Sequence, residues 1–124
     1  MRLVGVHQDL LKVVRTAISE SDFDFMVVEG KRSKARQAEL VKSGASKTMN
    51  SRHLTGHAVD LAPVIIENEK TVIDWNNKAK FKALAELIKS VGKRLGVDVE
   101  WGGDWRTFYD GPHFQLSRKS YPDR

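Results

Sequence analysis

The chain has 124 residues, of which 40% are hydrophobic and 30% charged, and its formal net charge is +5. This length and composition are typical of one soluble globular domain with a modest core. Because the chain has no cysteine, disulfides are excluded and any metal site must use histidine and carboxylate side chains.

Three helices are predicted from apolar residues at helical spacing and from the residues that stop them. The first extends from about His7 to Glu20. The second begins at Ser33 and ends at Gly44, a residue suited to a C-terminal cap. The third has the clearest apolar face and ends at Gly96. Its apolar residues are Phe81, Leu84, Ala85, Ile88, Val91 and Leu95.

Four short strands are predicted between and after these helices. Residues 23–28 are apolar and rich in β-formers, and residues 57–62 alternate until Pro63 interrupts them. Two more strands, at 97–101 and 113–116, are expected to be joined by a turn at Gly102-Gly103. This order favours an α+β fold with a small, largely antiparallel sheet flanked by helices. Residues 45–52 are expected to form a loop, and the polar tail 117–124 to be loosely held.

Two histidines and two aspartates provide the side chains that a catalytic zinc site needs. His53 and Asp60 are seven residues apart with Gly56 between them. We expect a loop carrying His53, a tight turn at Gly56 and a strand that brings Asp60 back. His113, on a distant strand, would complete three ligands, and Asp110 is a spare carboxylate. Catalytic zinc uses three protein ligands, an open position and a nearby base.

The residues alone leave alternatives open at this site. A histidine or aspartate in a loop is usually only a polar surface residue, and short motifs have a high false-positive rate. Imidazole and carboxylate ligands suit zinc, and also manganese or cobalt. Glu100, in an apparently buried strand, and Asp104, after the glycine pair, compete with Asp110 as the base.

The pattern Ser51-x-His53-x-x-Gly56-x-Ala58-x-Asp60, followed by Asp110-x-x-His113-Phe114, resembles the signature of the zinc peptidases of the D-alanyl-D-alanine carboxypeptidase and dipeptidase family. It is most similar to the phage endolysins that act as L-alanyl-D-glutamate peptidases. The likeness extends from Glu29-Gly30-Lys31-Arg32 to His113-Phe114-Gln115-Leu116 and implies a hedgehog/D,D-peptidase-like fold.

This resemblance also implies roles for individual residues. His53, Asp60 and His113 would hold Zn²⁺, Asp110 would be the catalytic base, and Arg32 would stabilise charge on the substrate carbonyl. Many relatives carry glutamate where Asp110 stands; the shorter side chain matches the endolysin branch.

Other side chains are candidates for supporting a ligand or contacting substrate, each with a simpler explanation. Ser51 could be a plain loop hydroxyl, and His57 is more simply a histidine packed beside the site than a fourth ligand. Gln37 would support Arg32, which could instead pair with Glu29 or Glu39. Tryptophans could flank a substrate groove; we favour this for Trp105 and a core position for Trp101, with Trp75 left open. Acidic residues Glu67, Glu69 and Asp74 could bind a cation or lie in a solvated loop.

We therefore expect a zinc peptidase that cuts the L-Ala–D-Glu bond of peptidoglycan in host lysis by a phage or prophage. Residues 1–124 would form a single monomeric catalytic domain without a wall-binding module. Residues 1–7 turn polar too soon for a secretory signal, so the enzyme would be made in the host cytoplasm. It would reach the periplasm and cell wall with a holin-type permeabilising protein.

Several alternatives and exclusions accompany this expectation. A D-alanyl-D-alanine carboxypeptidase or dipeptidase would use the same chemistry, and a zinc-stabilised binding module would use the ligands without catalysis. A small basic nucleic-acid binder is disfavoured because lysines and arginines are scattered rather than interleaved with aromatic residues. No apolar run approaches the roughly 18–20 residues of a membrane span, so no membrane insertion is expected.

Overall fold

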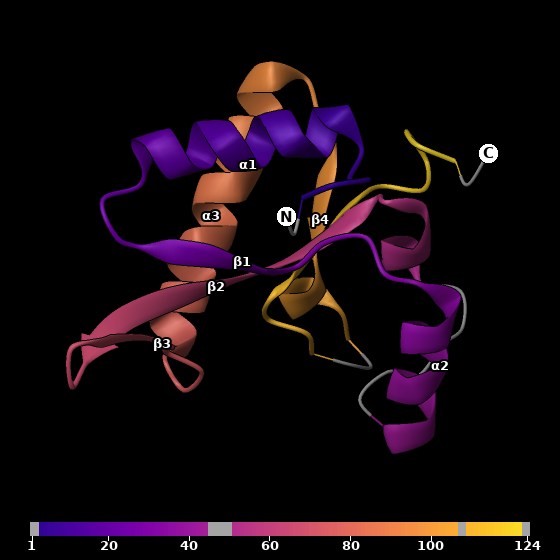
Figure 1. Ribbon diagram of the computed structural model, residues 1–124. Helices are drawn as coiled ribbons and strands as arrows, with labels where there is room; N and C mark the ends of the chain where they lie inside the picture. Colours follow the sequence, from indigo (N-terminus) through magenta and orange to yellow (C-terminus); the bar gives the residue numbers. More distant parts are fainter. Residues whose placement is uncertain (1–2, 45–50, 107–108, 123–124) are drawn as a thin grey trace.

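The computed structural model describes residues 3–44, 51–106 and 109–122. Within these described residues, three helices, two short 3₁₀ helices and five strands follow one another (Figure 1). They are α1 (Gln8–Glu20), β1 (Phe25–Glu29), α2 (Lys34–Ser43), η1 (Arg52–Thr55), β2 (Ala58–Glu67), β3 (Lys70–Ile73), α3 (Lys78–Leu95), β4 (Val99–Trp101), η2 (Gly102–Asp104) and β5 (His113–Leu116). The three predicted helices are confirmed to within a few residues at each end.

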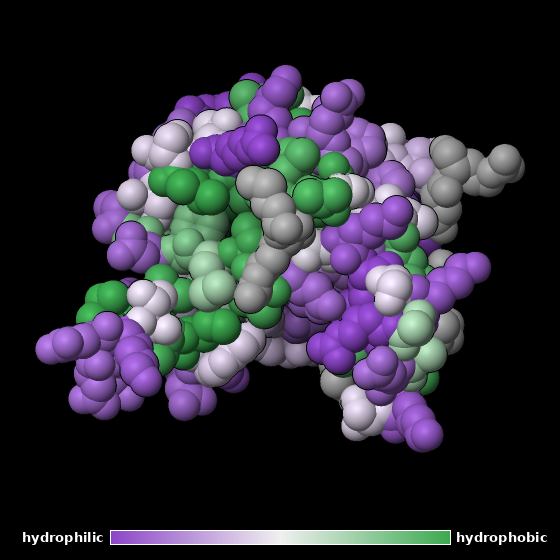
Figure 2. Space-filling view, in the orientation of Figure 1, coloured by the Kyte–Doolittle hydropathy of each residue, from purple (hydrophilic) through white to green (hydrophobic). Residues whose placement is uncertain are grey.

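The sheet has the strand order β1-β2-β5-β4, and β3 pairs with the far part of β2. All four strand pairings are antiparallel, which confirms the expected α+β class. Helices α1 and α3 contact each other, and α3 also contacts β2 and β4. Helix α2 stands apart from them, at the lower right of Figure 1, and the face seen in that region of Figure 2 is mostly hydrophilic.

Alternation along the central strands gives the sheet one apolar and one polar face. The apolar face contributes to the core with α1 and α3 through Val59, Leu61, Val99, Trp101, Phe114 and Leu116. Successive side chains on a strand point to opposite faces. The intervening residues Asp60, Glu100, His113 and Gln115 therefore lie on the other face, where the predicted site residues gather.

Strand β2 continues through Pro63 to Glu67, so the predicted interruption is wrong. Pro63 falls between the part of β2 that pairs with β5, up to Asp60, and the part that pairs with β3, from Val64. Its carbonyl accepts a hydrogen bond from the N–H of Asp74. A backbone N–H at this position would face the gap between β5 and β3 rather than a paired strand. A proline, which has no N–H, is therefore tolerated there.

Strand β3 was not predicted. The two-residue turn before it places Asn68 and Glu69 at positive φ, 51° and 65°, as type I′ hairpin turns require. The sequence lacks the Asn-Gly or Asp-Gly pair that usually marks such a turn.

Two other expectations need correction. The connection from β4 to β5 is longer than a turn at Gly102-Gly103, because it runs from η2 to Pro112. The tail is not loosely held over residues 117–122: Arg52 Nη2 donates to the carbonyls of Leu116 (3.1 Å) and Tyr121 (2.5 Å). Of the expected loop at 45–52, residues 45–50 lie outside the described residues, and Arg52 begins η1. None of the described helices is both long and apolar enough to cross a membrane.

Candidate metal centre

His53 is held in place by the short helix η1 and its caps. Ser51 Oγ accepts a hydrogen bond from the backbone N–H of His53 (3.2 Å) and caps the helix. Gly56 ends it in the left-handed region, with φ 78°. A Cβ on Gly56 would lie 2.1 Å from the carbonyl oxygen of Gly5, so only glycine fits. The turn predicted between His53 and Asp60 is present, and the expected loop before it is this helix.

Asp60 and His113 face each other across the pairing of β2 with β5. Asp60 Oδ1 lies 3.1 Å from His53 Nε2 and 3.5 Å from His113 Nδ1, and one ligating atom from each residue lies within 4.8 Å of the others. Four ligands at the usual zinc distances in a tetrahedron are about 3.3 Å apart. The three side chains are therefore spaced as ligands of a single small cation.

In each imidazole, the outer nitrogen is the one that points away from Asp60, and its hydrogen bond determines which nitrogen carries the proton. His53 Nδ1 is 2.8 Å from the carbonyl oxygen of Gly30, and His113 Nε2 is 2.8 Å from Gln115 Oε1. Both partners are acceptors, so each outer nitrogen carries the proton. The inner nitrogen of a neutral ring then directs a lone pair at Asp60 Oδ1. Such facing acceptors require a positive charge among them, either a proton or a metal ion.

The electrostatics of the cluster formed by His53, Asp60 and His113 agree with this geometry. Burial alone would raise the pKa of Asp60, but hydrogen bonds and charge from His113 and His53 outweigh it and hold the pKa well below its usual range. Burial alone would lower the pKa of His113, yet the hydrogen bond and charge of Asp60 raise it. The raised pKa of His113 thus favours a proton at the position that a metal ion would occupy.

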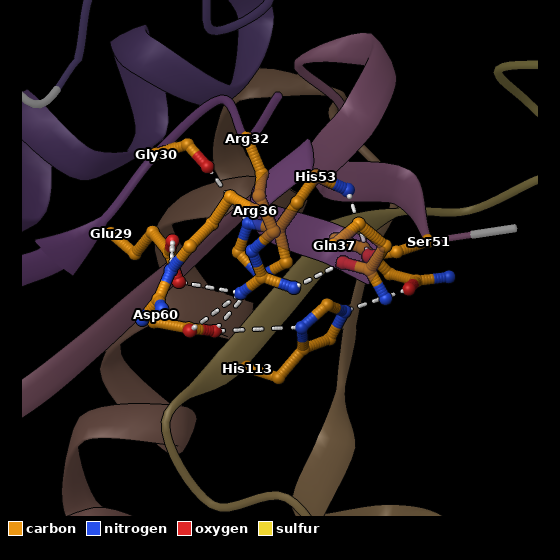
Figure 3. A network of polar contacts seen from close by, with 10 residues as sticks. Glu29, Gly30, Arg32, Arg36, Gln37, Ser51, His53, Asp60 and His113 are labelled. Atoms are coloured by element: carbon orange, nitrogen blue, oxygen red, sulfur yellow. Dashed lines mark hydrogen bonds and ion pairs between the residues drawn. The ribbon is translucent and has the colours of Figure 1, made fainter. Parts of the chain in front are cut away.

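Arg32 lies beside the cluster, buried to 8% exposure, and is held from two sides (Figure 3). Its Nη1 donates to Gln37 Oε1 (2.6 Å) and its Nη2 to Glu29 Oε2 (2.5 Å). The same Nη2 lies 3.6 Å from Asp60 Oδ2. Arg32 therefore faces one carboxylate oxygen of Asp60 while the other faces the histidines.

Asp110 approaches the cluster from the loop before β5. Its N–H donates to the carbonyl of Gly102 (3.0 Å), and its carbonyl accepts from the N–H of His113 (3.1 Å). Burial and the charge of Asp60 raise the pKa of the Asp110 carboxyl, against smaller opposing effects of His113, His53 and Arg32. The carboxyl thus lies within electrostatic reach of the predicted ligands.

The remaining candidates lie beside the site, at the surface or in the core. The Trp105 ring packs against the His113 ring, with centroids 4.9 Å apart, whereas His57 Nδ1 contacts Thr55 Oγ1 (2.6 Å) outside the cluster. Trp101 is in the core, as expected. Trp75 is exposed and stacks on Phe81.

The two competing bases do not face the histidines. Asp104 pairs with Lys89 at the surface. Glu100, expected in a buried strand, is on the exposed side of β4, where its Oε1 accepts from Gln115 Nε2 (3.2 Å). Glu67 and Glu69 are exposed at the β2–β3 turn, and Asp74 accepts a hydrogen bond from Asn77.

Sequence reasoning missed Gly30 and Gln115 as partners of the histidines. The contact of Gly30 is made by a backbone carbonyl, which no residue type reveals. Gln115 had a readable signal, because a residue two positions after His113 on a strand shares its face.

Comparisons with known proteins identify the relatives of this chain. Residues 1–117 match the family of phage L-alanyl-D-glutamate peptidases. The L-alanyl-D-glutamate peptidase of Escherichia phage T5 is 36% identical over 129 residues, which cover 93% of this chain and 91% of that protein. The peptidoglycan L-alanyl-D-glutamate endopeptidase CwlK of Bacillus subtilis is 30% identical over 92% of this chain and 71% of its own length.

Two further relatives are informative. The L-alanyl-D-glutamate peptidase of Listeria phage A118 is 41% identical over 83% of this chain, which corresponds to 34% of that longer protein. The crystal structure of the L-Ala D-Glu endopeptidase ChiX of Serratia marcescens superposes with a TM-score of 0.84 at 44% identity, covering 98% of this chain and 87% of that one. The chain belongs to the phage L-alanyl-D-glutamate peptidase family.

Proposed function

We propose that this protein is a zinc-dependent peptidase that hydrolyses the L-Ala–D-Glu bond of peptidoglycan stem peptides. The observation that carries the proposal is the convergence of His53, Asp60 and His113 in a chain whose relatives are named for cleavage of that bond. The two inner imidazole nitrogens and Asp60 Oδ1 form the ligand set.

Zinc is the cation that this donor set fits best. Two neutral imidazoles and one carboxylate are ligands of catalytic zinc, while calcium and magnesium prefer oxygen ligands alone. Manganese and cobalt use similar ligands and are the alternatives. A zinc ion here would act as a Lewis acid that polarises the amide carbonyl and lowers the pKa of water toward neutrality.

Asp110 is proposed as the group that takes a proton from the attacking water and returns it to the departing amine. A carboxylate in water is a weak base, and burial beside Asp60 raises the pKa of Asp110, which strengthens it for this role. Its position one turn before His113 keeps it close to the ligands without making it one of them.

Arg32 is proposed to stabilise the negative charge that develops on the substrate carbonyl. Its hydrogen bonds to Glu29 and Gln37 hold the guanidinium at the edge of the cluster, so little reorganisation is needed during the reaction. Trp105, packed on His113, is the aromatic side chain placed to contact the peptide.

The proposed setting is lysis of a host cell by a phage or prophage. Two of the relatives come from phages of Escherichia and Listeria, and the family match extends over residues 1–117, in line with a single catalytic domain. We propose that the enzyme acts as a monomer on the periplasmic cell wall, and that a holin-type protein gives it access from the host cytoplasm.

The test combines metal content with product identity in one purified sample. We expect about one zinc per chain, loss of peptidoglycan cleavage on chelation and recovery with zinc. The new amino terminus should be D-Glu. Release of D-Ala instead would assign the chain to carboxypeptidase chemistry, and cleavage that survives complete metal removal would refute the zinc proposal.

A further inference from the structure

His113 is linked to a pair of side chains on the polar face of the sheet. His113 and Gln115 are two residues apart on β5, and Glu100 on β4 is the cross-strand partner of Gln115. His113 Nε2 is 2.8 Å from Gln115 Oε1, and Gln115 Nε2 is 3.2 Å from Glu100 Oε1. The three groups therefore form a continuous hydrogen-bonded row that ends at the side of His113 facing away from Asp60.

The chemistry of this row determines the direction of every hydrogen bond. A carboxylate only accepts, so Glu100 must face the NH₂ end of the Gln115 amide. The amide oxygen is thereby turned toward His113, and it can only accept from Nε2–H. A neutral imidazole has one proton, so Nδ1 is left with its lone pair toward Asp60 Oδ1, 3.5 Å away.

Without this row, the proton has a competing position. Asp60 is also an acceptor, and a proton on Nδ1 could be donated to it. That tautomer would direct N–H at the place where a metal ion must bind. Gln115 is 7% exposed, so its hydrogen bond is shielded from water and favours the Nε2–H tautomer more than an exposed bond would.

We infer that Gln115, oriented by Glu100, is a positioning residue that holds His113 in the tautomer and ring orientation needed to ligate the metal. The inference rests on the proposed metal site. Histidine ligands of metals commonly donate their outer N–H to such an acceptor, and loss of the acceptor lowers metal affinity by about 10–100-fold.

The experiment measures zinc affinity of the purified, metal-stripped protein by competition with a chromogenic chelator. Gln115→Leu should weaken zinc binding about 10–100-fold. The double variant Gln115→Glu with Glu100→Gln reverses the inner pair but keeps an acceptor for His113, so it should recover affinity to within a few-fold of the unmodified protein. Ser117→Ala is the control: this polar side chain is also buried, but its Oγ accepts a hydrogen bond from the N–H of Ser120, and its loss should leave zinc affinity unchanged.

A second measurement uses an exposed position, so it does not depend on whether the buried variant Gln115→Leu folds. Glu100 is exposed, and Glu100→Ala should fold while leaving the Gln115 amide free to rotate. Long-range ¹H–¹⁵N spectra of the metal-free protein, recorded at a pH where the His113 ring is neutral, should show its proton on Nε2 in the unmodified chain, with a larger Nδ1–H fraction in Glu100→Ala.

The outcomes separate this inference from the proposed function. An unmodified protein that fails to bind zinc would refute the metal site itself. Normal zinc binding in both the unmodified protein and Gln115→Leu, or a neutral His113 ring whose single proton lies on Nδ1 in the metal-free unmodified chain, would overturn the role of Gln115 alone. Weak binding in Gln115→Leu, recovered in the double variant, would support it.

Discussion

His53 Nε2 and His113 Nδ1 both face Asp60 Oδ1, and this arrangement makes proton and metal binding competitive at the residue scale. In the metal-free protein, a proton on the inner nitrogen makes the imidazole a cation, which then pairs with the carboxylate of Asp60. In the metal-bound protein the same nitrogen must be unprotonated. As the pH rises above about 6.5, the stability of the metal-free protein should therefore fall while its zinc affinity rises.

The first prediction concerns the pH dependence of thermal stability. The lowered pKa of Asp60 gives stability that is present above about pH 4 and lost as the pH falls through the lowered value. The raised pKa of His113 gives stability that is present below about pH 6.5 and lost as the pH rises through the raised value. With chelator, the melting temperature should fall as the pH rises above about 6.5 through that raised value, and the gain on adding zinc should grow over the same interval.

Differential scanning fluorimetry at constant ionic strength would measure both trends. His57→Gln is a suitable control, because His57 lies outside the cluster; its variant should keep the opposing trends. A gain from zinc that does not change with pH would show that zinc binds elsewhere.

The second prediction separates catalysis from zinc binding at Asp110. Asp110→Asn keeps the size of the side chain but cannot accept a proton from water. We expect peptidoglycan cleavage to fall about 10²–10⁴-fold, while zinc stays bound. Release of soluble stem peptides and metal content would be measured on the same sample.

Asp104→Asn is the matched control, since Asp104 is an exposed aspartate paired with Lys89, and its variant should remain active. Full activity of Asp110→Asn would remove Asp110 from catalysis and favour another base. A chain that binds zinc tightly but never cleaves peptidoglycan would instead be a binding module.

At the scale of elements, the turn after η1 connects two of the proposed ligands. The third prediction is that Gly56→Ala lowers both stability and zinc affinity. The added methyl would meet the carbonyl oxygen of Gly5 at 2.1 Å, so η1 or the N-terminal segment must move. His53 would move with η1. We expect a loss of more than about 2 kcal/mol in unfolding free energy, beyond the left-handed backbone cost alone.

Gly96→Ala isolates that backbone cost. Gly96 has φ 73°, and none of the described residues places an atom within 4 Å of the position that an added methyl would take. Its variant should therefore lose only about 1–2 kcal/mol and keep its zinc affinity. Urea unfolding and chelator competition would compare the two variants. Equal effects of both on zinc binding would show that the turn does not position His53.

Elements whose local signals agree with the fold were predictable from the sequence. Helices α1 and α3 have apolar residues at helical spacing that face the core, and α2 is capped by Ser33 and Gly44. The convergence of His53, Asp60 and His113 was also expected, from the loop, turn and strand pictured around Gly56 and from the resemblance to the zinc peptidases.

What was missed depends on contacts distant in sequence. The β2–β3 turn has Asn68 at a position where asparagine is usual, but Glu69 stands at positive φ where glycine is usual. Pro63 is accommodated because the partner strand of β2 changes there. Gly30 supports His53 through its carbonyl, and Arg52 holds the tail through two backbone oxygens. Residue types carry no signal for such backbone contacts, so tertiary structure was needed to find them.

At the scale of the whole molecule, the C-terminal segment joins two distant parts of the chain. Tyr121 is among the residues packed against the core, its ring meets His7 edge-on at 5.3 Å between centroids, and its hydroxyl donates to Asp9 Oδ2 (2.7 Å). Its carbonyl accepts from Arg52, the residue before His53. The segment thus connects the start of α1 to the helix that carries a proposed ligand.

The fourth prediction tests this connection through Tyr121→Phe, which removes one hydrogen bond and keeps the packed ring. The unfolding free energy at pH 7 should fall by about 1 kcal/mol. The hydrogen bond to Asp9, with burial, raises the pKa of Tyr121 to about 12. Stability from the bond is therefore complete below about pH 10, the value of an unfolded tyrosine, and lost as the pH rises toward 12. Urea unfolding of both proteins should show a difference in unfolding free energy that is constant from pH 7 to 9 and narrows above pH 10. Equal unfolding free energies at pH 7 would mean that packing of the ring, not the hydrogen bond, anchors the tail.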